Sequence, residues 1–394
     1  MKISSMNILV LEPLPSSYHG GQSLSTFEVS QGLSKRGYEV SLLALGEGDL
    51  IDRYREFCQQ ILNFPPQRLQ REILLRSGFR MLTDLAQVIL QWKRSFKQPS
   101  IIYLSNHECA LFGVLLSKIL RLPVVLHIRT AITPVMIFHQ QDRWSIRQID
   151  HYIAVSEHVA GEWSKEFSLK PDRLTVIYNG VDLDRFQPTQ EPSAAREILK
   201  LPIEGKLIGY IGRLSPDKGL EVLFQAFAQL LTAIQEPVYL AIAGEPSGFA
   251  TAKQGQAYKK HLYQLCEELN LKQTVIFLGH LSNPQVLFQA SDVTVLPSTY
   301  PEPFGRSIIE SMACATPVLA SQVGGIPTIF GSTLSDLTFL PKNPKSLHQK
   351  LIDFIDWRNQ RPLLGNQCRV HIFQQFSSIQ TLDKIELTLK SQFQ

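Results

Sequence analysis

Hydrophobic positions along the chain fall into two series of short apolar runs, and longer amphipathic stretches separate the runs of each series. Each run has five to seven residues, and such short, continuously apolar runs are typical of parallel strands covered on both faces. Strands of the first series are expected at Asn7–Glu12, Glu39–Leu45, Ile101–Ser105, Pro123–Ile128, Tyr152–Ser156 and Leu174–Asn179. Strands of the second series are expected at Lys206–Gly212, Val238–Gly244, Thr274–Gly279, Asp292–Pro297 and Thr316–Ser321.

The stretches between these runs have helical patterns, so strands and helices alternate as they do in doubly wound α/β domains. Helices are expected at Gln22–Arg36, His107–Leu120, Leu220–Leu231, Tyr258–Leu269, Pro284–Gln289 and Gly305–Ala313. A polar, proline-bearing segment, Asp184–Ala195, separates the two series. We predict two Rossmann-like domains, residues 1–185 and 186–375, that face each other across a cleft. Residues 376–394 are predicted to form a C-terminal helix that crosses back to the first domain.

Length and composition fit this organisation. A chain of 394 residues with 44% hydrophobic residues can bury two cores. The net charge of +4 is too small to indicate a nucleic-acid-binding protein. The five cysteines contain no Cys-x-x-Cys pair, so neither a disulfide framework nor a zinc site is indicated. With no signal peptide or membrane-spanning run apparent, we expect a cytoplasmic protein.

One stretch of the chain is more basic than the rest. Between Arg53 and Lys97, nine Lys or Arg residues stand against three acidic residues. The basic, amphipathic part, Arg68–Lys97, has two interpretations. It would bind an anionic membrane on the inner face of the cell and dock a lipid-linked acceptor, or it is a domain helix with its apolar side in the core and its charges in solvent.

The loops that follow strands are the candidate binding regions, because open α/β sheets bind ligands at the carboxyl ends of their strands. Gly20 and Gly21 come between the first strand and its helix, where they form either a phosphate-binding loop or only a tight turn. Arg213 follows a strand of the second series, and Lys218 precedes a helix five residues later. This pair indicates a diphosphate site, and the alternative is a pair of surface cations.

The segment "PEPFGRSIIE" follows another strand of the second series. Glu302 lies in its turn, and Glu310 lies in the second turn of the helix that opens at Phe304–Gly305. Carboxylates accept hydrogen bonds from vicinal hydroxyls, while the amides of Phe304, Gly305 and Arg306 are free to donate to phosphate or sugar oxygens. The combination suits a sugar nucleotide, although Glu302 alone would also stabilise a helix N-terminus.

Two further candidates end strands. His127 closes "PVVLHI" in the first domain, either facing the cleft or serving as a structural histidine. Gly279, His280 and Leu281 follow a strand of the second domain, and their backbone is a candidate to contact a nucleobase edge.

These motifs together resemble the group 1 family of retaining glycosyltransferases, which have the GT-B fold. The resemblance rests on "HGG", "YIAVSEHVA", "IYNGVDLDRF", "GRLSPDKG", "EPFGRSIIESMACATPVLAS" and "VGGIP", in this order, from about Asn7 to Pro327. The chain departs from the pattern at Ser311 and Ala315, where the family often has Ala and Gly, and at Thr328, where Glu is common.

The resemblance implies a role for each candidate. Arg213 and Lys218 would hold the donor diphosphate, which Gly21 would approach from the first domain. Glu310 would bind the ribose hydroxyls and Glu302 the donor sugar, while His127 would lie near the transferred sugar. The family generally needs no metal ion, so no metal site and no cofactor is expected.

The function that these roles imply is transfer of a hexose from a nucleoside diphosphate sugar to an acceptor hydroxyl of a glycan, a lipid-linked glycan or a glycolipid, with the acceptor itself left unidentified. Two alternatives remain open. A sugar-nucleotide epimerase or a phosphorylase has the same fold, and a non-catalytic partner would bind the sugar nucleotide without turnover.

Overall fold

The structure is a computed structural model that describes residues 6–19, 21–63, 101–133, 136–247 and 251–393. Gly20 and the basic segment Arg68–Lys97 lie outside these ranges. The chain forms two compact units: unit 1 comprises residues 1–177 and 382–394, and unit 2 comprises residues 178–381.

Unit 1 is built on a parallel sheet of seven strands in the order β3-β2-β1-β4-β5-β6-β7. Apolar side chains on both faces explain why the strands are continuous hydrophobic runs. The strands are β1 (Asn7–Glu12), β2 (Glu39–Ala44), β3 (Gln60–Asn63), β4 (Ile101–Leu104), β5 (Val124–Ile128), β6 (His151–Ala154) and β7 (Leu174–Val176).

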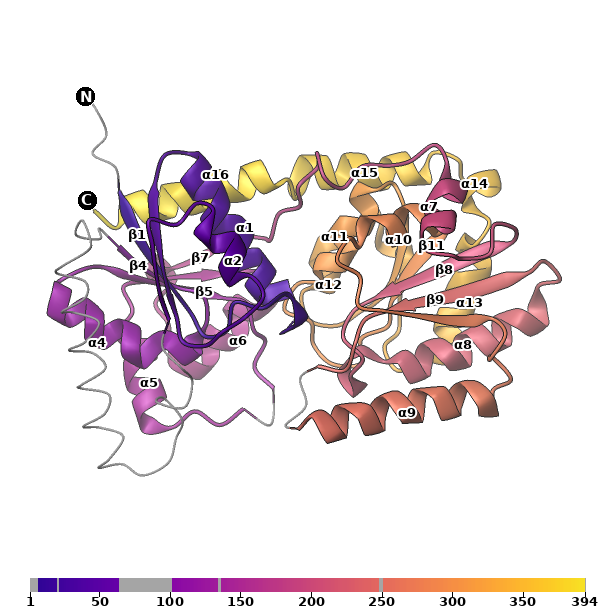
Figure 1. The fold of residues 1–394 in the computed structure, drawn as a ribbon, viewed down its shortest axis with the longest axis horizontal. Coiled ribbons are helices and arrows are strands. Elements are labelled where there is room, and N and C mark those ends of the chain that lie inside the picture. Colours follow the sequence, from indigo (N-terminus) through magenta and orange to yellow (C-terminus); the bar gives the residue numbers. More distant parts are fainter. Residues whose placement is uncertain (1–5, 20, 64–100, 134–135, 248–250, 394) are drawn as a thin grey trace. The chain divides into compact units, whose positions relative to one another are not determined.

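Helices cover both faces of this sheet. They are α1 (Gly21–Lys35), α2 (Ile51–Arg55), α4 (Ala110–Leu120), α5 (Gln140–Arg147) and α6 (Glu157–Phe167), joined by the C-terminal part of α16 (Ser378–Ser391). Side chains of α1, α2 and α16 share one core with alternate residues of the strands, and α4, α5 and α6 lie on the other face (Figure 1).

The end of α16 is fixed to unit 1 by both apolar and charged contacts. Ile385 and Leu389 are buried in the core under α1. Glu386 accepts hydrogen bonds from Arg36, at 2.7 Å, and from the Tyr38 hydroxyl, at 2.7 Å. The last residues of the chain therefore complete the core of the unit that contains its first residues.

Unit 2 has a parallel sheet of six strands in the order β10-β9-β8-β11-β12-β13. They are β8 (Lys206–Ile211), β9 (Val238–Ala243), β10 (Val275–Gly279), β11 (Val293–Leu296), β12 (Val318–Ser321) and β13 (Thr338–Phe339). The helices are α7 (Pro192–Ile198), α8 (Leu220–Ala233), α9 (Ala252–Glu268), α10 (Gln285–Ala290), α11 (Arg306–Ala313), α12 (Ile326–Phe330), α13 (Pro344–Phe354), α14 (Trp357–Gln360) and α15 (Leu364–Gln375).

The two parallel sheets confirm the predicted fold class, and each predicted strand is present, with ends that differ from the prediction by at most three residues. In both sheets the strand order reverses beside the first strand of the unit, between β1 and β4 in unit 1 and between β8 and β11 in unit 2. Such switch points are where doubly wound sheets bind ligands. They therefore mark the places where site residues are expected.

Three details differ from the predictions. The sequence pattern did not reveal β3, a partly polar edge strand, or β13, which has only two residues. Helix α9 begins at Ala252, six residues before the predicted start at Tyr258, because Thr251 and Gln254 form a capping box.

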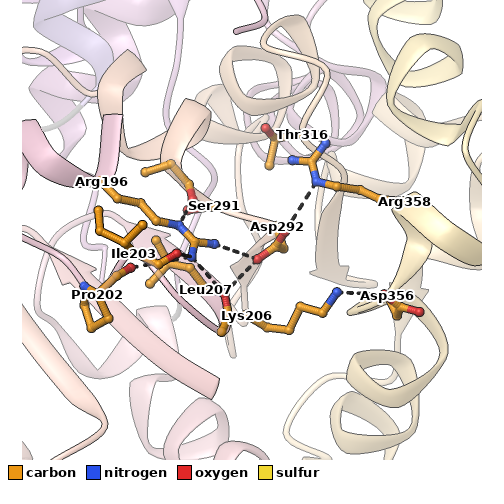
Figure 2. Close-up of polar contacts among 12 residues, drawn as sticks. Arg196, Pro202, Ile203, Lys206, Leu207, Ser291, Asp292, Thr316, Asp356 and Arg358 are labelled. Carbon is orange, nitrogen blue, oxygen red and sulfur yellow. Dashed lines mark hydrogen bonds and ion pairs between the residues drawn. The ribbon is translucent and has the colours of Figure 1, made fainter. Parts of the chain in front are cut away.

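A buried ion-pair network ties α7 and α14 to the amino ends of β8 and β11 (Figure 2). Arg196 of α7 donates to the Asp292 carboxylate at 2.9 Å, and the backbone N–H of Leu207 donates to the same carboxylate at 2.8 Å. Arg358 approaches the second carboxylate oxygen at 3.3 Å. Because ligands bind at the carboxyl ends of strands, this network at the opposite end is structural.

Ala315 has a left-handed backbone, with φ of +58°, directly after α11. A side chain costs about 1–2 kcal/mol in this region, and glycine avoids most of that cost. We expect Ala315→Gly to raise the free energy of unfolding by about 0.5–1 kcal/mol after the greater backbone entropy of glycine is subtracted. Urea denaturation would measure it. Ala233→Gly at the exposed, right-handed end of α8 is the matched control and should destabilise, whereas stabilisation by both would contradict the explanation.

Candidate functional site

The candidate residues of unit 2 gather at the switch point between β8 and β11. Arg213 and Lys218 lie in the loop after β8, and Glu302 lies in the loop after β11. The two strands are neighbours, with Val293 opposite Ile208, so residues more than 80 positions apart meet at one edge of the sheet. The structure thus brings together the two motifs that were singled out separately in the sequence.

The loop after β8 is held by its own hydrogen bonds and by a close backbone approach. The Tyr210 hydroxyl donates to the Arg213 carbonyl at 2.8 Å. Gly219 has φ of +69°, and a Cβ there would lie 2.0 Å from the Pro297 carbonyl oxygen. Only glycine lets this loop pack against the loop after β11. Lys218 lies in the 3₁₀ turn Pro216–Lys218, and the helix begins at Leu220.

Glu302 is the most constrained residue of the site, with 8% of its surface exposed. Its carboxylate forms an ion pair with Lys218 and accepts a hydrogen bond from the Ser298 hydroxyl at 2.5 Å. Its carbonyl accepts from Gly325 N–H at 2.8 Å, and a Cβ on Gly324 would lie 2.2 Å from the same carbonyl oxygen. The "VGG" segment therefore fixes the backbone of Glu302, and Lys218 and Ser298 fix its carboxylate.

Helix α11 carries the second carboxylate. Gly305 precedes it with φ of +111°, and the buried ring of Phe304 packs against Tyr178 and Phe376, at centroid distances of 6.0 and 5.8 Å. Glu310 accepts from Arg306 Nη2 at 2.8 Å and Nε at 3.1 Å. Arg306 was singled out for its backbone amide, but its guanidinium is also part of the site, as the i,i+4 spacing could have shown.

The charges of this site are balanced in pairs. Arg213 donates to Asp217 at 3.2 Å, which adds a third pair to Lys218–Glu302 and Arg306–Glu310. Asp217 was not among the predicted residues, because its role depends on how the loop folds. Cations for an anionic group and carboxylates for hydroxyl groups therefore stand side by side, which suits a ligand with both phosphate and sugar parts.

Gly279, His280 and Leu281 lie away from the switch point between β8 and β11. Gly279 ends β10, the edge strand, which is separated from β8 by β9. Its carbonyl accepts from the N–H of Gly244 at 2.7 Å. Their predicted contact with a nucleobase stays a prediction.

Unit 1 carries a second polar cluster, at the carboxyl ends of β1, β4 and β5. His127 is 1% exposed, and its Nδ1 lies 2.5 Å from the Tyr103 hydroxyl. Arg129 Nη2 donates to that hydroxyl at 3.1 Å, and Glu12 ends β1 on the same face of the sheet. Gly21 begins α1 beside this cluster's switch point. Of these residues only His127 and Gly21 were predicted, although a charged residue at the end of a buried strand is itself a signal.

Burial raises the pKa of Glu12 to about 7 from its ordinary 4.5, and hydrogen bonds from Tyr54 and Ser23 and the charge of Arg129 offset only part of that effect. The Tyr54 hydroxyl donates to the carboxyl group at 2.8 Å. A raised folded-state pKa means that the folded protein keeps this proton longer than the unfolded chain does. The protonated carboxyl group of Glu12 therefore contributes fully to the stability of the folded protein below pH 4.5, and this contribution is lost as the pH rises to about 7.

We expect this loss to amount to about 3 kcal/mol of the free energy of unfolding of unit 1. Urea denaturation between pH 4.5 and 8 would measure it, by comparing the chain with its Glu12→Gln variant. The variant should gain about that amount relative to the unmodified chain as the pH rises. Glu56→Gln, at an exposed position of the same unit, is the control. A difference between Glu12→Gln and the unmodified chain that does not vary with pH would contradict this assignment.

Within the described ranges, no three His, Cys, Asp or Glu side chains are grouped so as to hold a metal ion. No helix in the same ranges combines the length and the apolar character needed to cross a membrane.

Comparison with known proteins gives two family matches. Residues 193–370 match the family model described as glycosyl transferases group 1, and residues 19–185 match the model described as Glycosyltransferase Family 4. A D-inositol 3-phosphate glycosyltransferase of Streptomyces scabiei is 32% identical over 231 residues, which are 57% of this chain and 50% of that protein. The chain spans about half the length of the curated relatives it matches.

Solved structures match nearly the whole chain. The crystal structure of Anabaena HepE in complex with UDP and glucose has a TM-score of 0.82 at 23% identity and covers 98% of this chain and 100% of that one. Sucrose-phosphate synthase of Thermosynechococcus elongatus has a TM-score of 0.77 at 20% identity, covering 98% and 99%. This likeness confirms the predicted fold of two parallel-sheet α/β domains.

Proposed function

Because the chain belongs to the group 1 glycosyltransferase family and has its GT-B fold, we propose that it transfers a hexose from a nucleoside diphosphate sugar to an acceptor hydroxyl. We propose further that the transfer retains the anomeric configuration and needs no metal ion. The supporting observation is the paired arrangement of Arg213, Lys218, Glu302 and Glu310 at the switch point of unit 2.

The hard step in such a transfer is departure of the diphosphate. The bond between the anomeric carbon and the β-phosphate oxygen breaks, and negative charge grows on the leaving group. Lys218 and Arg213 would stabilise this charge, because fixed cations in a part-buried site need little reorganisation. The acceptor hydroxyl would attack from the same face, and its proton would pass to the departing phosphate oxygen.

The carboxylates would hold the rest of the donor. Glu310, oriented by Arg306, would accept hydrogen bonds from the ribose hydroxyls. Glu302, oriented by Lys218 and Ser298, would accept from hydroxyls of the transferred sugar. Phe304 anchors the turn through its buried ring, which leaves the backbone at Gly305 and Arg306 to approach the sugar and phosphate. His127 and Gly21 of unit 1 are proposed to act on the transferred sugar and the diphosphate.

The two carboxylates are expected to respond differently to neutralisation. Glu310→Gln should weaken binding of both UDP and UDP-glucose by about 10- to 100-fold, because hydrogen bonds to a charged acceptor are lost in both complexes. Glu302→Gln should weaken only binding of UDP-glucose, since UDP has no hexose. Isothermal titration calorimetry would measure both ligands, and equal losses for UDP in the two variants would contradict the separate assignments.

The proposal as a whole is tested by incubating the protein with a sugar nucleotide and a panel of acceptors, and determining the anomeric configuration of the product by NMR. A product with the donor's configuration, formed equally in the presence of EDTA, supports it. Conversion of the donor without an acceptor indicates an epimerase. Binding of the donor without turnover on any acceptor indicates a non-catalytic partner.

A further inference from the structure

The polar cluster of unit 1 holds one imidazole in a defined chemical state. Tyr103, on β4, and His127, on β5, project to the same face of the sheet, and their rings meet edge to face with centroids 5.9 Å apart. Arg129 follows β5 by one residue and reaches back to the Tyr103 hydroxyl. Tyr103 and His127 are each about 1% exposed, and Arg129 is 7% exposed. Each hydrogen bond in this cluster is therefore shielded from water.

The direction of these hydrogen bonds follows from the chemistry of Arg129. A guanidinium has donors only, so the Tyr103 oxygen must accept from Arg129 Nη2. The hydroxyl hydrogen of Tyr103 then needs an acceptor, and His127 Nδ1 lies 2.5 Å away. If Nδ1 carried the hydrogen instead, the buried hydroxyl hydrogen would lack an acceptor, which is unfavourable away from water.

The hydrogen of a neutral His127 is thereby placed on Nε2. Burial, together with the positive charge of Arg129, holds the pKa of His127 well below its usual range, so the ring is neutral. The other titratable group of the cluster, Glu12, interacts with Tyr103 and Arg129 through its charge. Among the described residues, no group hydrogen-bonds to His127 Nε2, which is buried. A buried N–H without a protein acceptor is open to an acceptor atom of a ligand or of a water molecule.

We propose that Tyr103 and Arg129 are positioning residues that lock His127 as the neutral Nε2–H tautomer, so that it acts as a hydrogen-bond donor to a substrate oxygen and not as a base. The inference rests on the proposed function only for its last part, the identity of the oxygen as one of the sugar nucleotide or acceptor. The tautomer itself is a property of unit 1 alone.

The tautomer is measured directly by ¹⁵N–¹H long-range correlation spectra of the full chain labelled with ¹⁵N-histidine. The His127 signal is identified by its loss in His127→Asn. We expect the pattern of a protonated Nε2 and an unprotonated Nδ1, unchanged between pH 5.5 and 8.5. A protonated Nδ1, or titration of the ring within this range, would overturn the proposal without any reference to catalysis.

Variants of Tyr103 and Arg129 test whether these two residues set the tautomer of His127. Tyr103→Phe should mix the tautomers or bring the ring into titration, since Nδ1 loses its donor. Tyr152→Phe is the matched control: Tyr152 is also buried in this sheet, and its hydroxyl donates to the Ile146 carbonyl at 2.5 Å. Arg129→Lys is a second variant, which keeps the positive charge. If both Tyr103→Phe and Arg129→Lys keep the tautomer pattern of the unmodified chain, Tyr103 and Arg129 do not set the tautomer.

Activity separates this inference from the proposed function. Tyr103→Phe should lower kcat/KM for transfer about 10-fold and leave the Kd of UDP unchanged, whereas Tyr152→Phe should change neither. If His127 is the Nε2–H tautomer but the protein transfers no sugar, the role of Tyr103 and Arg129 is supported and the proposed function is refuted. If the protein transfers sugar but His127 is the Nδ1–H tautomer, the proposed function is supported and the role of Tyr103 and Arg129 is refuted.

Discussion

Lys218→Ala is expected to lower the rate of sugar transfer about 10²- to 10³-fold and to weaken donor binding, because the variant loses a preorganised cation at the proposed diphosphate site. The effect should exceed that of an ordinary lost contact. Lys218 is also the ion-pair partner of Glu302, whose side chain is only 10% exposed. Its removal leaves a part-buried carboxylate without its counterion, next to the place where the diphosphate would bind. Calorimetry with UDP-glucose, together with the transfer assay, measures both effects.

The ion pair between Lys218 and Glu302 leads to a second expected result at the same position. In the double variant Lys218→Ala with Glu302→Gln, part of the lost UDP binding should return, because the unpaired negative charge is gone. Lys206→Ala is the matched control: Lys206 pairs with Asp356 at 2.7 Å, at the other end of the same strand. If Lys206→Ala weakens donor binding as much as Lys218→Ala, the loss reflects general electrostatics or stability rather than the site.

Asp292→Ala is expected to lower the free energy of unfolding of unit 2 by about 3–5 kcal/mol, because it leaves the buried Arg196 guanidinium without its counterion. Asp292 also accepts from the backbone of Leu207 at the start of β8, so the change loosens the centre of the sheet as well. For a unit of this size the loss corresponds to a fall in Tm of about 10 °C. Differential scanning calorimetry would measure it.

The control for this prediction shares the same carboxylate. Arg358 contacts Asp292 at 3.3 Å, but 42% of its side chain is exposed, so Arg358→Ala should cost less than about 1 kcal/mol. Because the network lies at the amino ends of the strands, folded Asp292→Ala protein should bind UDP-glucose normally at low temperature. Loss of UDP-glucose binding by the folded variant would contradict a purely structural role.

The strands were predictable because burial on both faces leaves a continuous apolar run, as in β1 and β8. The same reasoning explains the omissions. β3 lies at a sheet edge and includes Gln60 and Asn63, and β13 is too short to have a pattern. The start of α9 is masked by polar residues on its exposed first turns, so only its later apolar positions were visible in the sequence.

The site was predictable where the backbone decides it and not where tertiary packing does. Glycines and cations after strands marked the loops of Gly21 and Lys218. The pairing of Lys218 with Glu302, however, depends on β8 and β11 being neighbours, and nothing in either motif indicates that neighbour. Tyr103 resembles any core residue of an apolar strand. Its role depends on His127 and Arg129, which belong to a different strand and its loop.

The central claim is that unit 2 binds a nucleoside diphosphate sugar through Lys218 and Glu310. The most direct measurement is the thermal shift of the unmodified chain, Lys218→Ala and Glu310→Gln against a panel of nucleoside diphosphate sugars. A ligand that binds only the folded state raises the apparent Tm. We predict that at least one sugar nucleotide raises the Tm of the unmodified chain and that both variants lose most of this shift. No shift with any member of the panel, or equal shifts in all three proteins, would contradict the claim.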